Sequence, residues 1–582
     1  MSVSLSSLPL DLLLQIVNEV PRLEDRKSLR RTCLLLGDAF KPHVLSEVTL
    51  NIHRDNLNPG ISLLQAIVNE REKLNEDSVC KHIRTLNIYS LSPAYFLESA
   101  VDFEERLRNL RYTYEVEKQS RRWSKAIPLS DKVAMAERQL QSLLKPALGS
   151  LDYLTAIRWR WHSKDSQWTL TSILECLESH NFHRNIKEFT FTYCPSDTHI
   201  PILFPNLKHL RVCSITGNLS EADLKKLVQH PMISDNSQLT TLCLSKVDQG
   251  YHPGIFFDGH IPTNISSLRL NGLRLASVET IIRRNLTSLE LGSVMFTDNA
   301  SWGSLWDILS LQRIHLRNFA MCHNTRSDYM DKMLDYFQSY SGLESFSLKG
   351  PWWYDASLYD VYAVRFYENV LPMHVNSLVN LQIKPEFESK WCFGVDNVDV
   401  VRRCKRLRSL CFKVDHRGLE PDINPDLWTI GMLYSDENGR MSVPSGSGNG
   451  SSYPNLVHLL LEMISSDLHD LEKLTLEPAR NPDWAHDHTD MLFGAQFRLG
   501  VQRRLRTSVE SFTHNPYNEV LNWVRVYVVD EQVLTLRRSK DGVERKKQEK
   551  QTFWKSNRIT ASVIQKMSRM VKKKPSSESR RK

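Results

Sequence analysis

A six-residue pattern, apolar-x-x-apolar-x-apolar, recurs along most of the chain and dominates its arrangement of hydrophobic and polar positions. The last three residues of each copy alternate apolar, polar and apolar, which is typical of a β-strand with one buried face. The copies begin at Ile83, Leu154, Ile186, Leu207, Leu239, Ile265, Leu286, Leu311, Leu343, Leu378, Leu407 and Leu471. A pattern that returns this often predicts a repeat architecture rather than a row of unrelated domains.

The spacing of the copies indicates the kind of repeat. Between Ile186 and Leu407 successive copies start 21 to 35 residues apart. The shortest spacings match leucine-rich repeats, in which about 20–29 residues form one strand and a returning helix or turn. Helical patterns fill several gaps, at 221–228, 278–283 and 329–337, and another helix is predicted just after Pro454. We therefore expect an α/β solenoid over residues 51–536, with an ordinary α/β domain of buried strands as the open alternative.

The predicted solenoid is irregular. The Asn or Cys that usually follows the strand in leucine-rich repeats is mostly missing, so we expect the turns to be held mainly by apolar stacking. Residues 104–144 are charged and helical in composition, which predicts an inserted helical segment. Residues 438–452 are rich in Gly and Ser, which predicts a flexible loop.

The first fifty residues predict three short helices followed by a strand. A helix is expected from Leu8 to Val20, because Pro9 suits a first helical position and apolar residues then recur at helical spacing until Pro21. A second helix can begin near Glu24, a third element ends at Pro42, and 44–50 alternates like a strand. Such a small helical unit leaves apolar surface uncovered, and either a cap on the following domain or a docking surface for another protein explains it.

The order and spacing of these residues resemble an F-box, the adaptor-binding motif of SCF ubiquitin-ligase receptors. The resemblance covers about 43 residues and assigns residues 1–50 to a three-helix F-box. It implies adaptor contacts from eight residues: Leu8, Pro9, Leu12, Leu13, Ile16, Leu29, Cys33 and Leu45. Together with the repeats, it makes the chain similar to the large fungal-type families of F-box proteins with leucine-rich repeats.

Charge separates the C-terminus from the rest. The chain carries a net charge of +8, yet residues 537–582 hold 17 Lys and Arg against 4 Asp and Glu, which leaves a net charge of −5 on residues 1–536. We expect 537–582 to be a basic, partly disordered tail. A solvated extension, a nuclear-import signal, and a contact with an acidic or membrane surface all remain open for it.

The sequence predicts no chemistry of its own. It contains no phosphate-binding glycine loop, no GxSxG motif and no CxxC pair, so we expect no catalytic residue, cofactor or metal. The closest metal-like cluster, 483–490, is read as solvated side chains. Cys243 and Cys411 fall at polar positions of strand copies, which predicts half-exposed thiols without a reactive role. No apolar run reaches the roughly 18–20 residues of a membrane span, and no export signal is evident, so we expect a cytoplasmic or nuclear protein without membrane contact.

The polar positions of the strand copies predict a binding surface. If they all face one side, bases outnumber carboxylates there, and a groove for an acidic or phosphorylated partner segment follows. The predicted groove residues are Lys208, His209, Arg211, Arg269, Arg313, His315 and Arg408, with Arg84 and Arg158 on the same surface.

The function implied by the resemblance is that of a non-catalytic substrate receptor in an SCF-type ubiquitin ligase. In such a receptor the F-box binds a Skp-type adaptor, the adaptor binds a cullin–RING core, and the repeats bind a target protein. Two alternatives remain open: a repeat scaffold without a ligase role, and a nuclear nucleic-acid-associated protein that uses the basic tail. We do not expect nucleic acid to be the main partner, because the rest of the chain is acidic.

Overall fold

The structure of the chain is a computed structural model, which divides into two compact units, Met1–Gly350 and Pro351–Lys582. Each unit is described by itself below. The residues that the structure describes are 12–13, 15, 20, 23–31, 34–72, 78–94, 131–162, 165–179, 185–194, 204–246, 255–257, 261–279, 281–296, 300–322, 329–350, 356–414, 455–479, 502–512, 523–529, 531–539 and 542–547.

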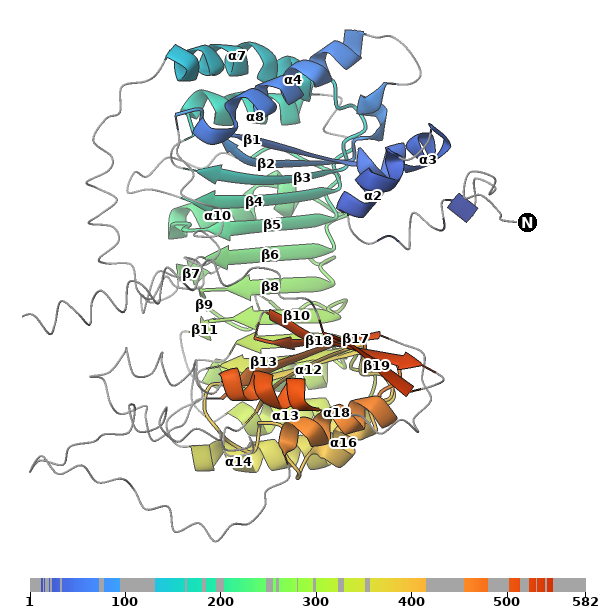
Figure 1. Cartoon of the computed structure of the whole chain (residues 1–582). Coiled ribbons are helices and arrows are strands. Elements are labelled where there is room, and N and C mark those ends of the chain that lie inside the picture. Colours follow the sequence, from blue (N-terminus) through green and yellow to red (C-terminus); the bar gives the residue numbers. More distant parts are fainter. Residues whose placement is uncertain are drawn as a thin grey trace, which may run out of the picture. The chain divides into compact units, whose positions relative to one another are not determined.

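The first unit alternates strands with helices or turns (Figure 1). Its helices are α2 (Leu23–Arg30), α3 (Leu34–Val44), α4 (Leu57–Glu72), α7 (Asp131–Leu148), α8 (Gln167–Glu178), α10 (Glu221–Gln229), α11 (Pro231–Ser234), α12 (Ala300–Leu311) and α13 (Met330–Gln338), with short 3-10 helices η2 (Arg54–Asn56) and η3 (Val79–His82). The strands of its main sheet are β1 (Glu47–Ile52), β2 (Thr85–Leu91), β3 (Ala156–His162), β4 (Glu188–Cys194), β5 (Val212–Gly217), β6 (Thr241–Lys246), β8 (Ser267–Asn271), β10 (Ser288–Gly292), β12 (Asn318–Cys322) and β13 (Ser345–Gly350).

These strands are parallel and lie in the order of the sequence, β1-β2-β3-β4-β5-β6-β8-β10-β12-β13, without closing into a barrel. Their register is constant from β2 to β13, whereas it shifts between Leu50 and Asn51 where β1 pairs with β2. Leu268 of β8 lies opposite Leu242 of β6 and Leu289 of β10, and each of the three is the second apolar residue of its copy. The α/β fold class is therefore confirmed, and the six-residue pattern predicted most of the strands.

Alternation along the strands gives the sheet one buried face and one open face. The second and third apolar residues of each copy are buried on the side of the helices. On β12, for example, Phe319 packs against Trp306 of α12 and Phe337 of α13, with ring centroids 5.6 and 4.9 Å apart. The polar positions between them point to the opposite side and are mostly half-buried or exposed. We call that side of the first unit the open face.

A ladder of backbone hydrogen bonds joins the copies where the chain enters each strand. The carbonyl of Arg84, for example, accepts the N–H groups of Thr155 and Ala156 at 2.8 and 2.9 Å. The same pair of bonds repeats at the carbonyls of Ser46, Thr155, Lys187, Arg211, Thr240, Ser266, Thr287 and Arg317. The expectation that apolar stacking mainly holds the turns is therefore incomplete, because these backbone groups are paired from one copy to the next along the whole sheet.

Two predicted strands are misplaced. The copy assigned to 207–212 lies mostly before β5, which starts at Val212, and the copy assigned to 311–316 lies entirely before β12, which starts at Asn318. The pattern also fits 210–215 and 316–321, and these frames carry the strands. Overlapping apolar residues allow both frames, and α12, which continues to Leu311, excludes the earlier frame of the second copy.

Between β6 and α12 the outer side of the copies is extended rather than helical. Short strands β7 (Ile255–Phe257), β9 (Leu273–Leu275) and β11 (Met295–Phe296) form a separate parallel sheet in the order β11-β9-β7. The helices predicted at 221–228 and 329–337 are present as α10 and α13. The one predicted at 278–283 is wrong, because the described residues there form turns.

The second unit continues the same pattern. Its helices are α14 (Ala356–Arg365), the π-helical η6 (Phe366–Val370), α15 (Leu371–His374), α16 (Val398–Arg402) and α18 (Leu456–Ser466). Its strands are β14 (Asn380–Pro385), β15 (Ser409–Val414), β16 (Lys473–Pro478), β17 (Trp523–Val528), β18 (Glu531–Ser539) and β19 (Gly542–Lys547). β14 to β17 are parallel neighbours, whereas β17, β18 and β19 pair antiparallel.

Several predicted boundaries shift. The boundary at 50 falls inside β1, which pairs with β2 and belongs to the main sheet. The boundary at 536 is wrong, because β18 and β19 carry the sheet to Lys547. Of the predicted insertion at 104–144, the described part is α7, which continues to Leu148. The loop predicted at 438–452 and residues 548–582 lie outside the described residues.

Candidate interaction surfaces

The N-terminal segment carries the predicted adaptor contacts, and the structure separates them by exposure. Leu12 is 44% exposed, whereas Leu13 is fully buried. Leu29 and Leu45 are half-buried. The side chains of Leu8, Pro9, Ile16 and Cys33 lie outside the described residues. Of the predicted set, Leu12 is therefore the described residue that offers the most surface to another protein, and Leu13 packs inside the chain.

The residues of the predicted basic groove do not all lie on the open face. Lys208 and His209 lie in the turn before β5, and Arg313 and His315 lie in the turn before β12. Arg211 and Arg408 occupy the last position before β5 and β15, where the backbone ladder runs. Arg269 lies within β8 on the open face. The prediction failed because it placed every polar position of the pattern on one side, while only those inside the strands share the open face.

Two of these residues are held by their own neighbours. Arg269 forms an ion pair with Glu290 on the adjacent strand β10, with Nε and Oε2 2.5 Å apart. The ring of His315 stacks on that of Tyr340 at a centroid distance of 4.7 Å. A carboxylate that already neutralises Arg269 weakens its attraction for an acidic ligand.

Arginine and tyrosine side chains gather instead on β2 and β3 and in the turns just before these strands, where Arg84 and Tyr153 lie. The Arg160 guanidinium lies over the Tyr89 ring, 5.5 Å from its centroid, and that of Arg84 lies 5.3 Å from the centroid of Tyr153. Arg158 lies between the two pairs along β3 and is exposed. We call these five residues the arginine–tyrosine patch. Stacked guanidinium groups are held in place without losing their charge.

Two titratable groups lie where β2 and β3 end. The carboxylate of Asp165 accepts the backbone N–H of Leu91 at 3.1 Å and that of His162 at 3.0 Å, and Ser90 donates its hydroxyl at 3.4 Å. Burial raises the pKa of Asp165 to about 6, although these hydrogen bonds oppose the shift. Burial and the charge of Arg160 lower the pKa of His162 to about 4. This cluster ties two strands together, with Asp165 buried and His162 half-buried.

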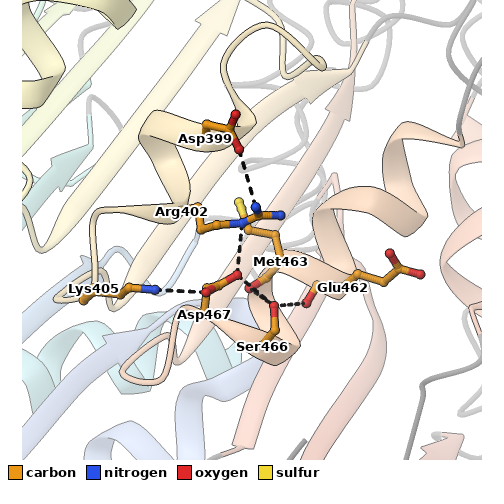
Figure 2. A network of polar contacts seen from close by, with 7 residues as sticks. All are labelled: Asp399, Arg402, Lys405, Glu462, Met463, Ser466 and Asp467. Carbon is orange, nitrogen blue, oxygen red and sulfur yellow. Dashed lines mark hydrogen bonds and ion pairs between the residues drawn. The ribbon is translucent and has the colours of Figure 1, made fainter.

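The second unit contains a charged network at the end of α18 (Figure 2). Asp467 lies 3.0 Å from Arg402 Nε and 3.0 Å from Lys405 Nζ, and Arg402 also lies 3.4 Å from Asp399. Partial burial would raise the pKa of Asp467, but hydrogen bonds from Lys405 and Ser466 and the charges of Lys405 and Arg402 outweigh it and lower the pKa. The network joins the turn after α16 to the turn after α18, which is a structural role.

The two kinds of candidate chemistry that the sequence raised, a metal cluster and cysteine thiols, can be checked among the described residues. No group of three His, Cys, Asp or Glu side chains among them could hold a metal ion, and the 483–490 cluster lies outside this part of the chain. Cys243 is half-buried as predicted, but Cys411 is only 7% exposed, and burial raises the pKa of its thiol to about 11. Burial also raises the pKa of Cys243, so neither thiol is activated.

No helix in the described segments is long and apolar enough to span a membrane.

No protein-family model matches the chain, and neither does any curated protein.

Proposed function

We propose that the chain is the substrate-recognition subunit of an SCF-type ubiquitin ligase. The observation that carries the proposal is the succession of two parts: a helical segment with the residue spacing of an F-box, then parallel strands in constant register with one open face. In this proposal the strands are an irregular leucine-rich-repeat array that binds a target protein, and the N-terminal segment binds a Skp-type adaptor.

The proposed mechanism is tethering. The adaptor would connect the chain to a cullin–RING core, and the repeats would hold a target so that its lysines meet the charged conjugating enzyme at high effective concentration. The chain itself then supplies no reacting group. Its contribution would be the distance and orientation between the two proposed binding surfaces.

One observation favours a second candidate, a repeat scaffold without a ligase role. Leu13 is fully buried, and β1 follows α3 directly and pairs with β2. A helical segment that packs its own apolar residues in this way can serve as an end cap for the sheet. The scaffold and the receptor differ in one property, which is adaptor binding.

Co-expression with a Skp-type adaptor separates the two. The full chain should retain the adaptor on an affinity resin, and Leu12→Asp should weaken retention by about tenfold or more, because it would bury an unpaired carboxylate in the complex. Met135→Asp is the matched control, since Met135 is an apolar residue of α7 that is 55% exposed. It should leave retention unchanged.

Leu13→Asp is not a clean test, because it places a charge in the interior of the chain and disturbs the fold. A wild-type chain that is folded but retains no adaptor would overturn the proposal in favour of the scaffold. Retention that Leu12→Asp and Met135→Asp leave equally intact would place the adaptor contact elsewhere.

A further inference from the structure

One face of β16 and β17, in the second unit, carries two cations next to an aromatic ring. Backbone pairing puts Lys473 opposite Arg525 and Thr475 opposite Tyr527, and all four residues lie within the strands. The apolar residues that alternate with them along both strands are buried, so the four side chains lie together on the other face. Lys473 and Arg525 are exposed, and Thr475 and Tyr527 are half-buried. We call these four residues the β16–β17 patch.

The two cations of the patch have no carboxylate of their own. Neither Lys473 nor Arg525 forms an ion pair or a side-chain hydrogen bond in the part of the chain that the structure describes. Glu477, further along β16, pairs with Lys384 of β14 instead, and Glu472, just before β16, pairs with neither cation. Like charges directly opposite each other on neighbouring strands destabilise a sheet. Binding of an anion would therefore relieve a repulsion that the fold leaves in place.

Tyr527 gives the patch a surface for stacking. The ammonium group of Lys473 lies 5.2 Å from the centroid of the Tyr527 ring, as in a cation–π contact. Thr475 lies directly opposite Tyr527, and Ser409 of β15 lies directly opposite Lys473. Both are small and half-buried, and both carry a hydroxyl group. A planar group can therefore approach the ring from the side of β15 without meeting a bulky residue at these two positions.

Basic residues continue along the sheet beyond the patch. Residues 523–547, which run from β17 to β19, hold 7 Lys and Arg against 4 Asp and Glu. The backbone row that contains Lys473 and Arg525 continues through Thr535 of β18 to Lys546 of β19. A basic stretch of sheet of this kind suits a ligand with a series of negative charges better than a ligand with a single charged group.

We propose that the β16–β17 patch binds single-stranded nucleic acid. Lys473 and Arg525 neutralise backbone phosphates, and a base stacks on the Tyr527 ring in the place of the Lys473 ammonium group. A single strand fits better than a duplex, because its unpaired bases can reach an aromatic ring on a sheet. This activity goes beyond the proposed function and does not involve the adaptor or the open face of the first unit.

The experiment uses the full chain and three fluorescent probes: a ten-nucleotide RNA of mixed sequence, its duplex, and a ten-residue peptide of alternating Glu and Ser. Fluorescence anisotropy at about 100 mM salt should give about tenfold tighter binding for the single strand than for either of the others. The same single strand with 4-thiouridine in place of uridine should form photo-crosslinks, and mass spectrometry should locate adducts within 473–478 and 523–528.

Variants separate stacking from charge. Tyr527→Thr should weaken binding of the single strand by about fivefold or more, whereas Tyr527→Phe should bind as wild type does, because its ring still stacks. Arg525→Gln should weaken binding and lower the slope of log affinity against log salt by about 0.7, the value for one phosphate contact of a single strand.

Arg274→Gln is the matched control for the charge. Arg274 is exposed on β9 of the separate small sheet and forms no ion pair in the described structure, so this variant should change neither the affinity nor the salt slope. The melting temperature of each variant reports on folding. If Tyr527→Thr proves unfolded, the salt slope of Arg525→Gln still tests the site, since Arg525 is exposed.

Three results would overturn the proposal. The first is an affinity and a salt slope that Arg525→Gln leaves at the wild-type values, or adducts confined to 548–582, either of which shows that the basic C-terminus alone binds. The second is equal or tighter binding of the peptide or the duplex, which assigns the patch to a different partner. The third is binding by a folded Tyr527→Thr chain that equals wild type.

Discussion

The buried pair Asp165 and His162 should give two variants opposite pH dependences of stability. Asp165 has a pKa of about 6 in the folded chain instead of 3.8, so the folded state binds its proton more tightly than the unfolded state. Its contribution to the free energy of unfolding is therefore present at low pH and is lost as pH rises from about 4 to 6. His162 has a pKa of about 4 instead of 6.5, so its contribution is lost as pH falls through the same range.

The two contributions are similar in size and opposite in sign. A pKa difference of about two corresponds to about 3 kcal/mol, because each pKa unit is worth about 1.4 kcal/mol. In the wild-type chain they largely cancel between pH 4 and 6.5. Asp165→Asn removes the contribution of Asp165 and leaves that of His162. The free energy of unfolding of this variant should therefore rise by about 3 kcal/mol relative to wild type as pH increases from 4 to 6.5. His162→Gln removes the contribution of His162, so the free energy of unfolding of that variant should fall by about 3 kcal/mol relative to wild type over the same increase in pH.

Asp165→Asn also loses the acceptor for one of the two backbone N–H groups. That loss costs about 1–3 kcal/mol at every pH, so it lowers the free energy of unfolding of the variant without changing how that free energy depends on pH. All other titratable groups contribute equally to the wild-type chain and to both variants.

Native-state hydrogen exchange gives the local readout, with the opening free energy followed in peptides that cover β2 and β3. The three chains should be compared at pH 4.0, 5.0, 6.0 and 6.5, after correction for the pH dependence of the intrinsic exchange rates. Curves of wild type and both variants that run parallel within about 1 kcal/mol would refute the reasoning. They would show that neither group is desolvated to the extent that its position implies.

Three further predictions follow from the packing. Tyr336→Phe removes a hydroxyl that donates to the Ile314 carbonyl at 2.7 Å and accepts the Leu316 N–H at 3.1 Å, and it should cost about 1–3 kcal/mol in urea denaturation. Tyr153→Phe is the control, because Tyr153 is 50% exposed, and it should cost nothing measurable. Asp467→Asn should destabilise the second unit by at most about 1–2 kcal/mol at pH 7, because the partners of Asp467 are largely exposed. The lowered pKa of Asp467 stabilises the folded state only while the carboxylate is charged, so the difference from wild type should vanish as pH falls below 3.8. Truncation after residue 547 should leave the melting temperature of the chain unchanged, whereas truncation after 536 should lower it, since it removes β19 and part of β18.

Sequence patterns predicted the strands of the main sheet better than its surfaces. The six-residue pattern depends on burial, and burial of two apolar residues per strand is what forms the sheet, so most strands lie where the pattern places them. The frame failed at 207–212 and 311–316, where extra apolar residues allow two alignments. The frame decides on which side of the sheet a side chain lies, so this error accounts for part of the failure of the predicted basic groove. Arg408 belongs to a correctly framed copy, but it precedes β15.

Other features depend on contacts that a pattern cannot supply. The stacking of Arg160 on Tyr89 joins residues 71 positions apart and follows only from the pairing of β2 with β3. The burial of Leu13 beside the exposed Leu12 depends on what packs against that helix. β17 alternates apolar and polar residues and could have been predicted as a strand, whereas the antiparallel pairing of β18 and β19 was hidden by the basic composition of residues 537–547.

The most direct test of the proposed function is affinity purification of the full chain from cells in which the proteasome is blocked. The proposal predicts that a Skp-type adaptor and a cullin co-purify with the wild-type chain and with Met135→Asp, and are depleted about tenfold or more with Leu12→Asp. Equal amounts of all three chains in the soluble fraction, with neither adaptor nor cullin above the level of an unrelated bait, would contradict it.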